Sequence, residues 1–233
     1  MSATSTIVPQ PLKHARGGDS VATAEQLPGF GRISRTELRR RLCHMLPGVF
    51  ALSLSLIPHE RPLPMIAFAH IAVLILLAAV LVRQVYPAIA RPGETDWTLN
   101  IIKYSCTILV VLLLFPMHPE FAAGVVAVVA FGDGSATLLG LLFGRHHLPW
   151  NPQKTWEGLV GFMVCSMPLA TLAYWLEAEP AVPLHVAATC ALTAVVCGQI
   201  AESLPLRSSD NLRVGIAAAS GVIVAHLFCC GVL

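Results

Sequence analysis

The sequence contains few charged residues. Asp, Glu, Lys and Arg make up 12% of its 233 residues, whereas hydrophobic residues make up 55%. A soluble globular domain carries about twice that charged fraction, and the mean hydropathy of +0.70 is that of an integral membrane protein. The apolar runs do not alternate as the strands of a barrel do, and helices are then the architecture that satisfies the backbone in lipid. We therefore expect an all-α, polytopic membrane helical bundle.

Several familiar motifs are also missing. The seven cysteines lie almost wholly in apolar runs and form no CxxC pair, which excludes the usual cysteine metal sites and a secreted disulfide framework. The chain has neither a GxxxxGK[ST] loop nor the protein-kinase signatures. Its N-terminus lacks the order of a signal peptide. A net charge of +2, spread along the chain, gives no argument for nucleic-acid binding.

Apolar runs of sufficient length predict about seven membrane spans. With a cytosolic N-terminus, fourteen of the fifteen Lys and Arg residues fall on the cytosolic side, and only Arg61 falls outside. Residues 1–36 are expected to form a disordered cytosolic tail, and residues 37–233 one membrane-embedded domain. The predicted spans are 45–58, 64–86, 98–116, 119–143, 156–176, 181–203 and 212–232.

An acid interrupts the fourth of these runs. Asp133 stands between Gly132 and Gly134. An ionisable group at such a depth is costly, and it usually marks a working site that faces the protein interior or a wet cavity. The glycines allow close approach of a partner helix or of a ligand phosphate. The alternative is a glycine-rich helix contact in which a neighbouring helix satisfies Asp133.

The segment before the fifth run combines basic residues with a predicted helix start. Asn151 followed by Pro152 is typical of a helix N-terminus, which places Lys154 in the first turn beside free N–H groups, with Arg145 nearby. Such an arrangement favours anion binding. Glu157 is expected to share the face of Lys154, where it binds a metal or pairs with the lysine. Alternatively, Lys154 extends to the membrane interface.

More carboxylates follow the sixth run. Glu202 lies within that run, and Asp210 and Asn211 precede the last one, where either is also a candidate helix cap. With Asp133 and Glu157, these acids supply four carboxylates near one membrane surface, a ligand type that Mg²⁺ shares with substrate phosphates. Basic residues in the same regions supply the charge that phosphates need: Arg145, Lys154, Arg207 and Arg213.

The segment ELRRRLCHMLPG, residues 37–48, precedes the first run. Its arginines, Arg41 among them, are suited to contact lipid headgroups or to fix the topology. His44, at the edge of the run, is in a position to reach the polar site.

Three segments resemble a known family. FGDGSATLLGLLFG (131–144), NPQKTWEG (151–158) and AESLPLRSSDN (201–211) are similar to CTP-dependent lipid kinases, namely dolichol kinase, phytol kinase and yeast-type diacylglycerol kinase. This family is in turn distantly similar to phosphatidate cytidylyltransferases. The similarity covers most of residues 37–233, with Thr155 where the family often has Ser. It implies phosphoryl transfer from CTP to the hydroxyl of a lipid alcohol at the cytosolic face, with Mg²⁺ as cofactor.

Residue chemistry and resemblance together assign the candidate site. Its partners are a lipid alcohol, a nucleoside triphosphate and membrane lipids. The catalytic candidates are Asp133, Lys154 and Glu157; the nucleotide or phosphate candidates are Gly132, Gly134, Arg145, Asn151, Lys154, Asn211, Arg41 and His44; the metal candidates are Asp133, Glu202 and Asp210. The alternatives are a cytidylyltransferase-like CDP-lipid synthase and a non-catalytic transporter or scaffold. The sequence leaves open which alcohol is used, and whether CTP, ATP or UTP is the donor.

Overall fold

The computed structural model describes residues 33–56, 60, 64–88, 97–206 and 210–231. Within these residues the regular secondary structure is helical apart from one two-stranded hairpin. Five helical segments are long and apolar enough to cross a membrane: Met65–Val85, Pro119–Phe143, Trp156–Glu177, Leu184–Ser203 and Asp210–Cys230. The predicted helical membrane bundle is thereby confirmed. The count of seven spans and the cytosolic N-terminus remain predictions.

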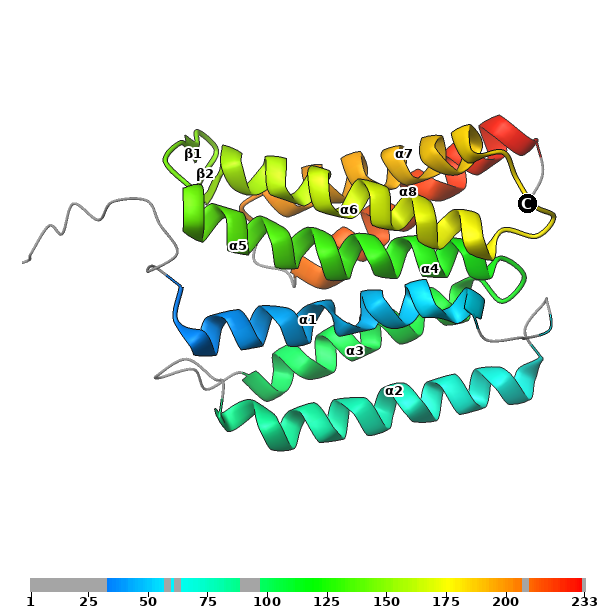
Figure 1. Cartoon of the computed structure of the whole chain (residues 1–233), viewed down its shortest axis with the longest axis horizontal. Coiled ribbons are helices and arrows are strands. Elements are labelled where there is room, and N and C mark those ends of the chain that lie inside the picture. The colour runs from blue at the N-terminus through cyan, green and yellow to red at the C-terminus, as the bar shows by residue number, and fades with distance from the viewer. Residues whose placement is uncertain (1–32, 57–59, 61–63, 89–96, 207–209, 232–233) are drawn as a thin grey trace, which may run out of the picture.

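The helices run back and forth along the long axis of the molecule (Figure 1). Three helices come first: α1 (Arg35–Ser53, continued by a 3-10 turn at Leu54–Leu56), α2 (Met65–Val85, continued by a 3-10 turn at Tyr86–Ala88) and α3 (Trp97–Leu114). The next helix is continuous from α4 (Pro119–Ala127) through a π-helical turn, η4 (Val128–Gly132), to α5 (Asp133–Phe143). The hairpin strands β1 (His147–Leu148) and β2 (Asn151–Thr155) follow, and then α6 (Trp156–Glu177), α7 (Leu184–Ser203) and α8 (Asp210–Cys230).

The helix formed by α4, η4 and α5 lies at the centre of the bundle. Every residue of α4 and η4 is buried, against α1, α6, α7 and α8. By contrast, α2 lies at the edge of the bundle in Figure 1 and buries only Phe68 and Ile71, mainly against α3. The apolar sequence 119–143 therefore carries Asp133 into the middle of the protein rather than to its lipid-facing surface.

Helix α1 begins before the predicted first span. Ser34 caps it, because its Oγ accepts a hydrogen bond of 3.1 Å from the backbone N–H of Glu37. Glu37 then pairs with Arg40 and Arg41 one turn later. The prediction that the tail extends to residue 36 is wrong at its end, since Arg35 and Thr36 are helical. Residues 1–32 of the predicted tail lie outside the described residues.

The predicted helix start at Asn151 and Pro152 is also wrong. Residues 151–155 form strand β2, which pairs antiparallel with β1 through Leu148 and Asn151. The true N-cap of α6 is Thr155, whose Oγ1 accepts a hydrogen bond of 3.1 Å from the N–H of Gly158. Lys154 therefore precedes the helix instead of lying in its first turn, and it does not share a helix face with Glu157.

Candidate active site

Asp133 is held by two side chains of α1. The Nη1 of Arg41 donates to its Oδ2 at 3.3 Å, and the Nε2 of His44 lies 3.1 Å from the same oxygen. Arg41 also donates through Nε to Glu37 at 3.1 Å, so the acidic residue at the start of α1 orients the arginine. Helices α1 and α5 thus bring together Arg41 and Asp133, which stand 92 positions apart in the sequence.

A second group of charges lies around Lys154. Its Nζ donates to Oε1 of Glu202, at the end of α7, and to Oδ2 of Asp210, at the start of α8, the latter at 3.4 Å. Arg213 donates to the other oxygen of Asp210 at 2.9 Å. Glu202 is only 1% exposed, so its carboxylate depends on the lysine for compensation.

Lys154 interacts electrostatically both with Asp133 and with the acids Glu202 and Asp210. Burial alone would lower the pKa of its ammonium, but the attraction of Glu202, Asp133 and Asp210 raises the pKa above the ordinary value for lysine. Lys154 is therefore positively charged at neutral pH, and this charge attracts Asp133 as well as Glu202 and Asp210.

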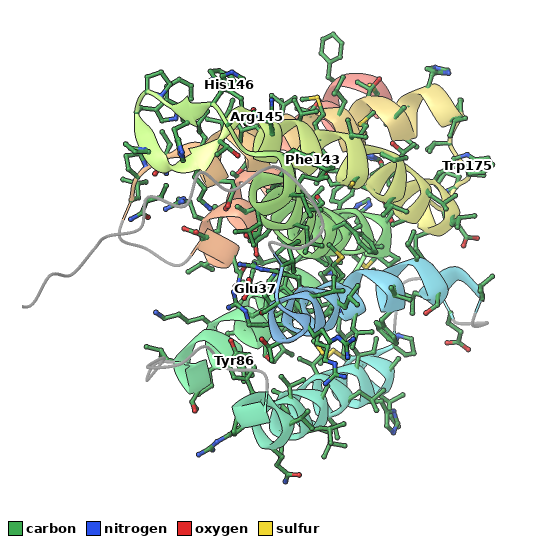
Figure 2. The ribbon with its side chains drawn as sticks, turned by 60° about the vertical axis from the view of Figure 1, so that its left-hand side comes forward. Glu37, Tyr86, Phe143, Arg145, His146 and Trp175 are labelled. Atoms are coloured by element: carbon green, nitrogen blue, oxygen red, sulfur yellow. The ribbon has the colours of Figure 1, made fainter. Side chains whose placement is uncertain are left out.

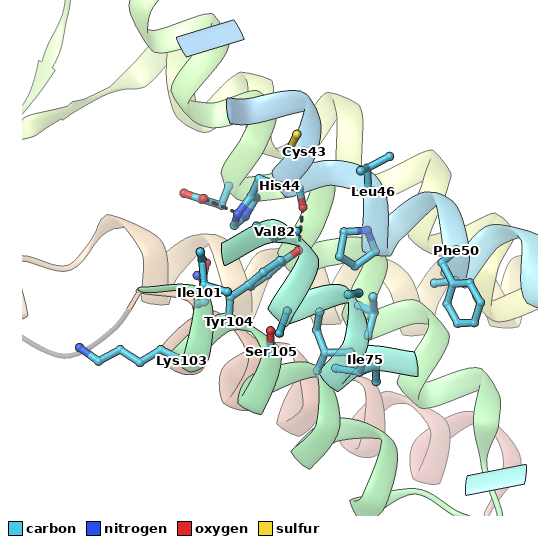
Figure 3. Close-up of a pocket in the computed structure, with 18 of the residues that line it drawn as sticks. Cys43, His44, Leu46, Phe50, Ile75, Val82, Ile101, Lys103, Tyr104 and Ser105 are labelled. Atoms are coloured by element: carbon cyan, nitrogen blue, oxygen red, sulfur yellow. Dashed lines mark hydrogen bonds and ion pairs between the residues drawn. The ribbon is translucent and has the colours of Figure 1, made fainter. Parts of the chain in front are cut away.

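A cavity of about 840 Å³ opens beside these residues. Six predicted site residues line it: Arg41, His44, Asp133, Lys154, Asp210 and Asn211. From this polar end the cavity continues between α1, α2, α3 and α4, where its lining is apolar and includes Phe50, Ile75 and Leu112. Figure 3 shows the two ends, with His44 and Phe50 on successive turns of α1.

Helix packing explains the glycines beside Asp133. A Cβ on Gly132 would lie 2.5 Å from the ring of Phe162 on α6, and one on Gly134 would lie 2.5 Å from the side chain of Met45 on α1. Both glycines thus permit close helix contact, which was the alternative interpretation. Contact with a phosphate remains a prediction for them. The π-helical turn immediately before Asp133 is a feature often found at functional sites.

Some predicted residues lie elsewhere. Glu157 accepts from the backbone N–H of His146 at 3.3 Å and lies 2.7 Å from its Nδ1, so it stabilises the hairpin and does not pair with Lys154. Arg145 is exposed in the connection between α5 and β1, where Figure 2 labels it, and it is not among the residues that line the cavity. Asn151 donates to the carbonyl of Ser203 at 3.1 Å and so ties the hairpin to α7. Of the predicted counter-charges, Arg207 lies outside the described residues.

The structure adds residues that sequence reasoning did not single out for the site. Tyr104 of α3 donates its hydroxyl to the backbone carbonyl of His44 at 2.8 Å and stacks on the imidazole. Arg40, Lys103 and Thr137 also line the cavity. A tyrosine within an apolar helix carries no local signal of such a role. The arginine and the lysine were interpreted as topology signals.

A ready-made metal site is not visible in the described part of the chain. There, no group of three or more His, Cys, Asp or Glu side chains has the spacing of metal ligands. The described acids of the site are instead compensated by Arg41, His44, Lys154 and Arg213.

Comparison with known proteins shows the family of the chain. The sequence profile of the cytidylyltransferase family matches residues 29–209, more than half of the chain. Phytol kinase 1, chloroplastic, of Arabidopsis thaliana is 27% identical over 106 residues, which are 43% of this chain and 34% of that protein. Probable phytol kinase, chloroplastic, of Triticum aestivum is 26% identical over 152 residues, which are 60% of this chain and 48% of that protein.

The chain thus matches between a third and a half of the length of these curated relatives. No solved structure matches it significantly. The resemblance to CTP-dependent lipid kinases, deduced from three motifs, is confirmed by the profile and by the two phytol kinases together. Because the profile matches more than half of the chain, the chain belongs to the cytidylyltransferase family.

Proposed function

We propose that the protein is a membrane lipid kinase that transfers the γ-phosphate of CTP to the hydroxyl of a lipid alcohol. The observation that carries the proposal is one continuous cavity. Its polar end holds Asp133, Arg41 and Lys154, and its other end is apolar and lies between helices of a membrane bundle. A kinase of this kind needs a water-accessible phosphate site and a hydrocarbon site that meet at one point.

Cationic side chains at the polar end suit a triphosphate. Arg40, Arg41 and Lys154 all line this end of the cavity. Guanidinium groups bind phosphate oxygens in pairs and an ammonium binds them as a point charge. In this proposal the three side chains exchange part of their carboxylate contacts for phosphate oxygens when the nucleotide binds.

Asp133 is the proposed proton acceptor. It lies at the junction of the polar and apolar parts, and His44 and Arg41 fix its Oδ2. In the reaction the alcohol oxygen forms a bond to the γ-phosphorus, and the bond from that phosphorus to the β,γ-bridging oxygen breaks. CDP leaves with the electron pair, and the hydroxyl proton passes to Asp133.

The acids near Lys154 fit a magnesium ion that is completed by substrate. The Oε2 of Glu202 is buried and has no hydrogen-bond partner among the described residues, and Asp210 is half-exposed beside it. Mg²⁺ is usually bound by one or two carboxylates together with substrate phosphates. Glu202 and Asp210 would hold the ion, and it would neutralise charge on the phosphates.

The test is transfer from γ-labelled CTP by the protein in liposomes. Phytol, farnesol, a long polyprenol and diacylglycerol are offered separately, and ATP and UTP replace CTP in parallel. We expect labelled lipid phosphate and CDP, no product after chelation of Mg²⁺, and a rate lowered by about 10² or more in Asp133→Asn.

Glu120→Gln is the matched control, because Glu120 is a buried acid paired with His118 at the opposite end of the bundle. Folded protein that transfers no label from any nucleotide contradicts the proposal.

A CDP-lipid synthase is the second candidate, because the profile that matches the chain is named for cytidylyltransferases. Its products differ in a way that the label reveals. With α-labelled CTP and phosphatidate, a synthase yields labelled CDP-lipid and pyrophosphate, whereas the proposed kinase yields labelled CDP only when an alcohol is present.

A further inference from the structure

The apolar part of the cavity is closed on one side and open on the other. Its inner wall, formed by Ala122, Ala123 and Val126 of α4, is buried. On the opposite side, Leu46 of α1 and Leu74 of α2 line the cavity and yet are 58% and 55% exposed. The cavity therefore opens to the surroundings along the α1–α2 side, where a membrane would supply hydrocarbon.

The cavity also has two defined ends. At the polar end, Arg40 of α1 hydrogen-bonds to Tyr86 at the end of α2 and joins the two helices. At the apolar end, Phe68 and Ile71 of α2 pack with Leu112 of α3. Ile71 and Leu112 line the cavity as well, so the packed cluster marks where the space stops.

The length of the cavity follows from the helices that line it. Lining residues extend on α1 from Arg40 to Leu54 and on α2 from Tyr86 to Ile71, which at the rise of an α-helix corresponds to about 20 Å. The hydrocarbon core of a bilayer is about 30 Å thick, so one leaflet is about 15 Å. A hydrocarbon chain that reaches across about one leaflet therefore fits along the length of the cavity, with its hydroxyl at Asp133.

We infer that the apolar part of the cavity is a binding site for one hydrocarbon chain, which enters sideways between α1 and α2, and that its blind end selects substrates by chain length. The inference rests on the proposed function for the identity of the reacting hydroxyl. The site itself is defined by the cavity alone. A longer chain has to leave through the open side, and it loses the contacts of the inner wall.

A pair of neighbouring residues on α2 tests the inference. Ala79 lines the cavity, about 10 Å along the helix from Tyr86. Val80 is 54% exposed and is not among the lining residues of the described cavity. Ala79→Phe places a ring across the middle of the site, whereas Val80→Phe adds a ring to the outer surface of the same helix.

The measurement is the ratio of transfer rates for geranylgeraniol and geraniol, taken within each variant so that the amount of active protein cancels. We expect Ala79→Phe to lower this ratio by about tenfold or more, and Val80→Phe to leave it close to that of the wild type. In the wild type, the rate is expected to fall again for a long polyprenol and for diacylglycerol. An unchanged ratio in Ala79→Phe overturns the inference.

Crosslinking separates this inference from the proposed function. A geranylgeraniol analogue with a photoreactive group at the end of its chain is expected to label α1 and α2 near Leu54 and Ile71, and Ala79→Phe is expected to reduce the labelling. If no alcohol is phosphorylated but this labelling is found, the kinase proposal fails and the chain site stands. Labelling confined to the outer surfaces of α6 to α8 overturns the chain site.

Discussion

Tyr104 and His44 join α3 to α1 through two contacts at once. The phenolic hydroxyl donates to the backbone carbonyl of His44 at 2.8 Å, and the two rings stack with centroids 4.3 Å apart (Figure 3). Since His44 in turn contacts Asp133, Tyr104 orients the imidazole without touching the acid in any described contact. Tyr104 is therefore a positioning residue for the proposed reaction.

Removal of the phenolic hydroxyl is expected to slow transfer without weakening nucleotide binding. Tyr104→Phe keeps the stacking and loses one hydrogen bond, worth about 1 kcal/mol, so kcat is expected to fall about fivefold while KM for CTP stays unchanged. In Tyr104→Leu, which also loses the stacking, kcat is expected to fall further. Tyr174→Phe is the control, because Tyr174 bonds to His226 elsewhere in the bundle. A purely structural role for Tyr104 would lower the melting temperature and leave kcat per folded molecule intact.

The ion pair of Lys154 with Glu202 predicts a stability defect that a second substitution repairs. Lys154→Met leaves a buried carboxylate without its partner, which is expected to cost about 3 kcal/mol of unfolding free energy. The double variant Lys154→Met, Glu202→Gln removes the charge as well, and most of that loss should be recovered. Transfer activity is expected to stay absent in both variants. Chemical unfolding in detergent measures the first effect and γ-label transfer the second; recovery of activity in the double variant would contradict a role for Lys154 in phosphate binding.

The raised pKa of Lys154 predicts where this stability is lost. The ordinary lysine pKa is about 10.4, and in the folded protein it is higher. The contribution of the ion pairs is therefore complete below about pH 10 and disappears only as the pH rises through the raised value. We expect the melting-temperature difference between wild type and Lys154→Met to be retained up to about pH 9.5 and to shrink above about pH 10.5. A difference that already shrinks between pH 7 and 9 would mean that the pKa is not raised.

Long apolar runs proved the most predictable part of the fold. The predicted span 119–143 coincides with the helix Pro119–Phe143, because a predominantly apolar segment of this length is long enough to cross a membrane as a helix. The π-helical turn at Val128–Gly132 inside it was not predictable, since nothing in the local sequence VVAFG distinguishes it from ordinary helix. In the structure this turn packs against α1 and α6.

The hairpin shows why a local pattern misled. Asn151 and Pro152 are typical of a helix start. In the structure, however, the side chain of Asn151 donates a hydrogen bond to the carbonyl of Ser203, 52 residues away. Leu148, on the preceding strand of the hairpin, is buried. The preference of Asn for a helix cap is worth only about 1 kcal/mol, and in the structure Asn151 makes the tertiary contact with Ser203 instead. Similarly, the partners of Asp133 come from a helix about 90 residues earlier, with Arg41 standing 92 positions before it. The place of His44 at the edge of the first run indicated that it reaches the polar site, whereas only the resemblance to lipid kinases indicated Arg41.

The contacts of Glu157 predict that it is dispensable for catalysis, unlike Glu202. Glu157→Gln keeps an acceptor for the N–H of His146 and removes only the charge beside its ring, so transfer is expected to change by about twofold at most. Glu202→Gln is the comparison, and it is expected to abolish most transfer and to raise the Mg²⁺ concentration required for the rest. A loss in Glu157→Gln as deep as that of Asp133→Asn would restore the catalytic role predicted from the sequence.

Two glycines of the central helix predict opposite effects of the same substitution. Gly132→Ala brings a Cβ within 2.5 Å of the Phe162 ring, whereas Gly124→Ala meets its nearest neighbour, Cβ of Tyr174, at an ordinary 3.7 Å. Overpacking against the ring is expected to lower the unfolding free energy by about 1–3 kcal/mol, while alanine at position 124 raises it by up to about 1 kcal/mol through helix propensity. Because Asp133 follows Gly132 directly, Gly132→Ala is also expected to reduce transfer per folded molecule. Unfolding and transfer measured on both variants check the pair, and equal stability of the two would show that α6 can move away from η4.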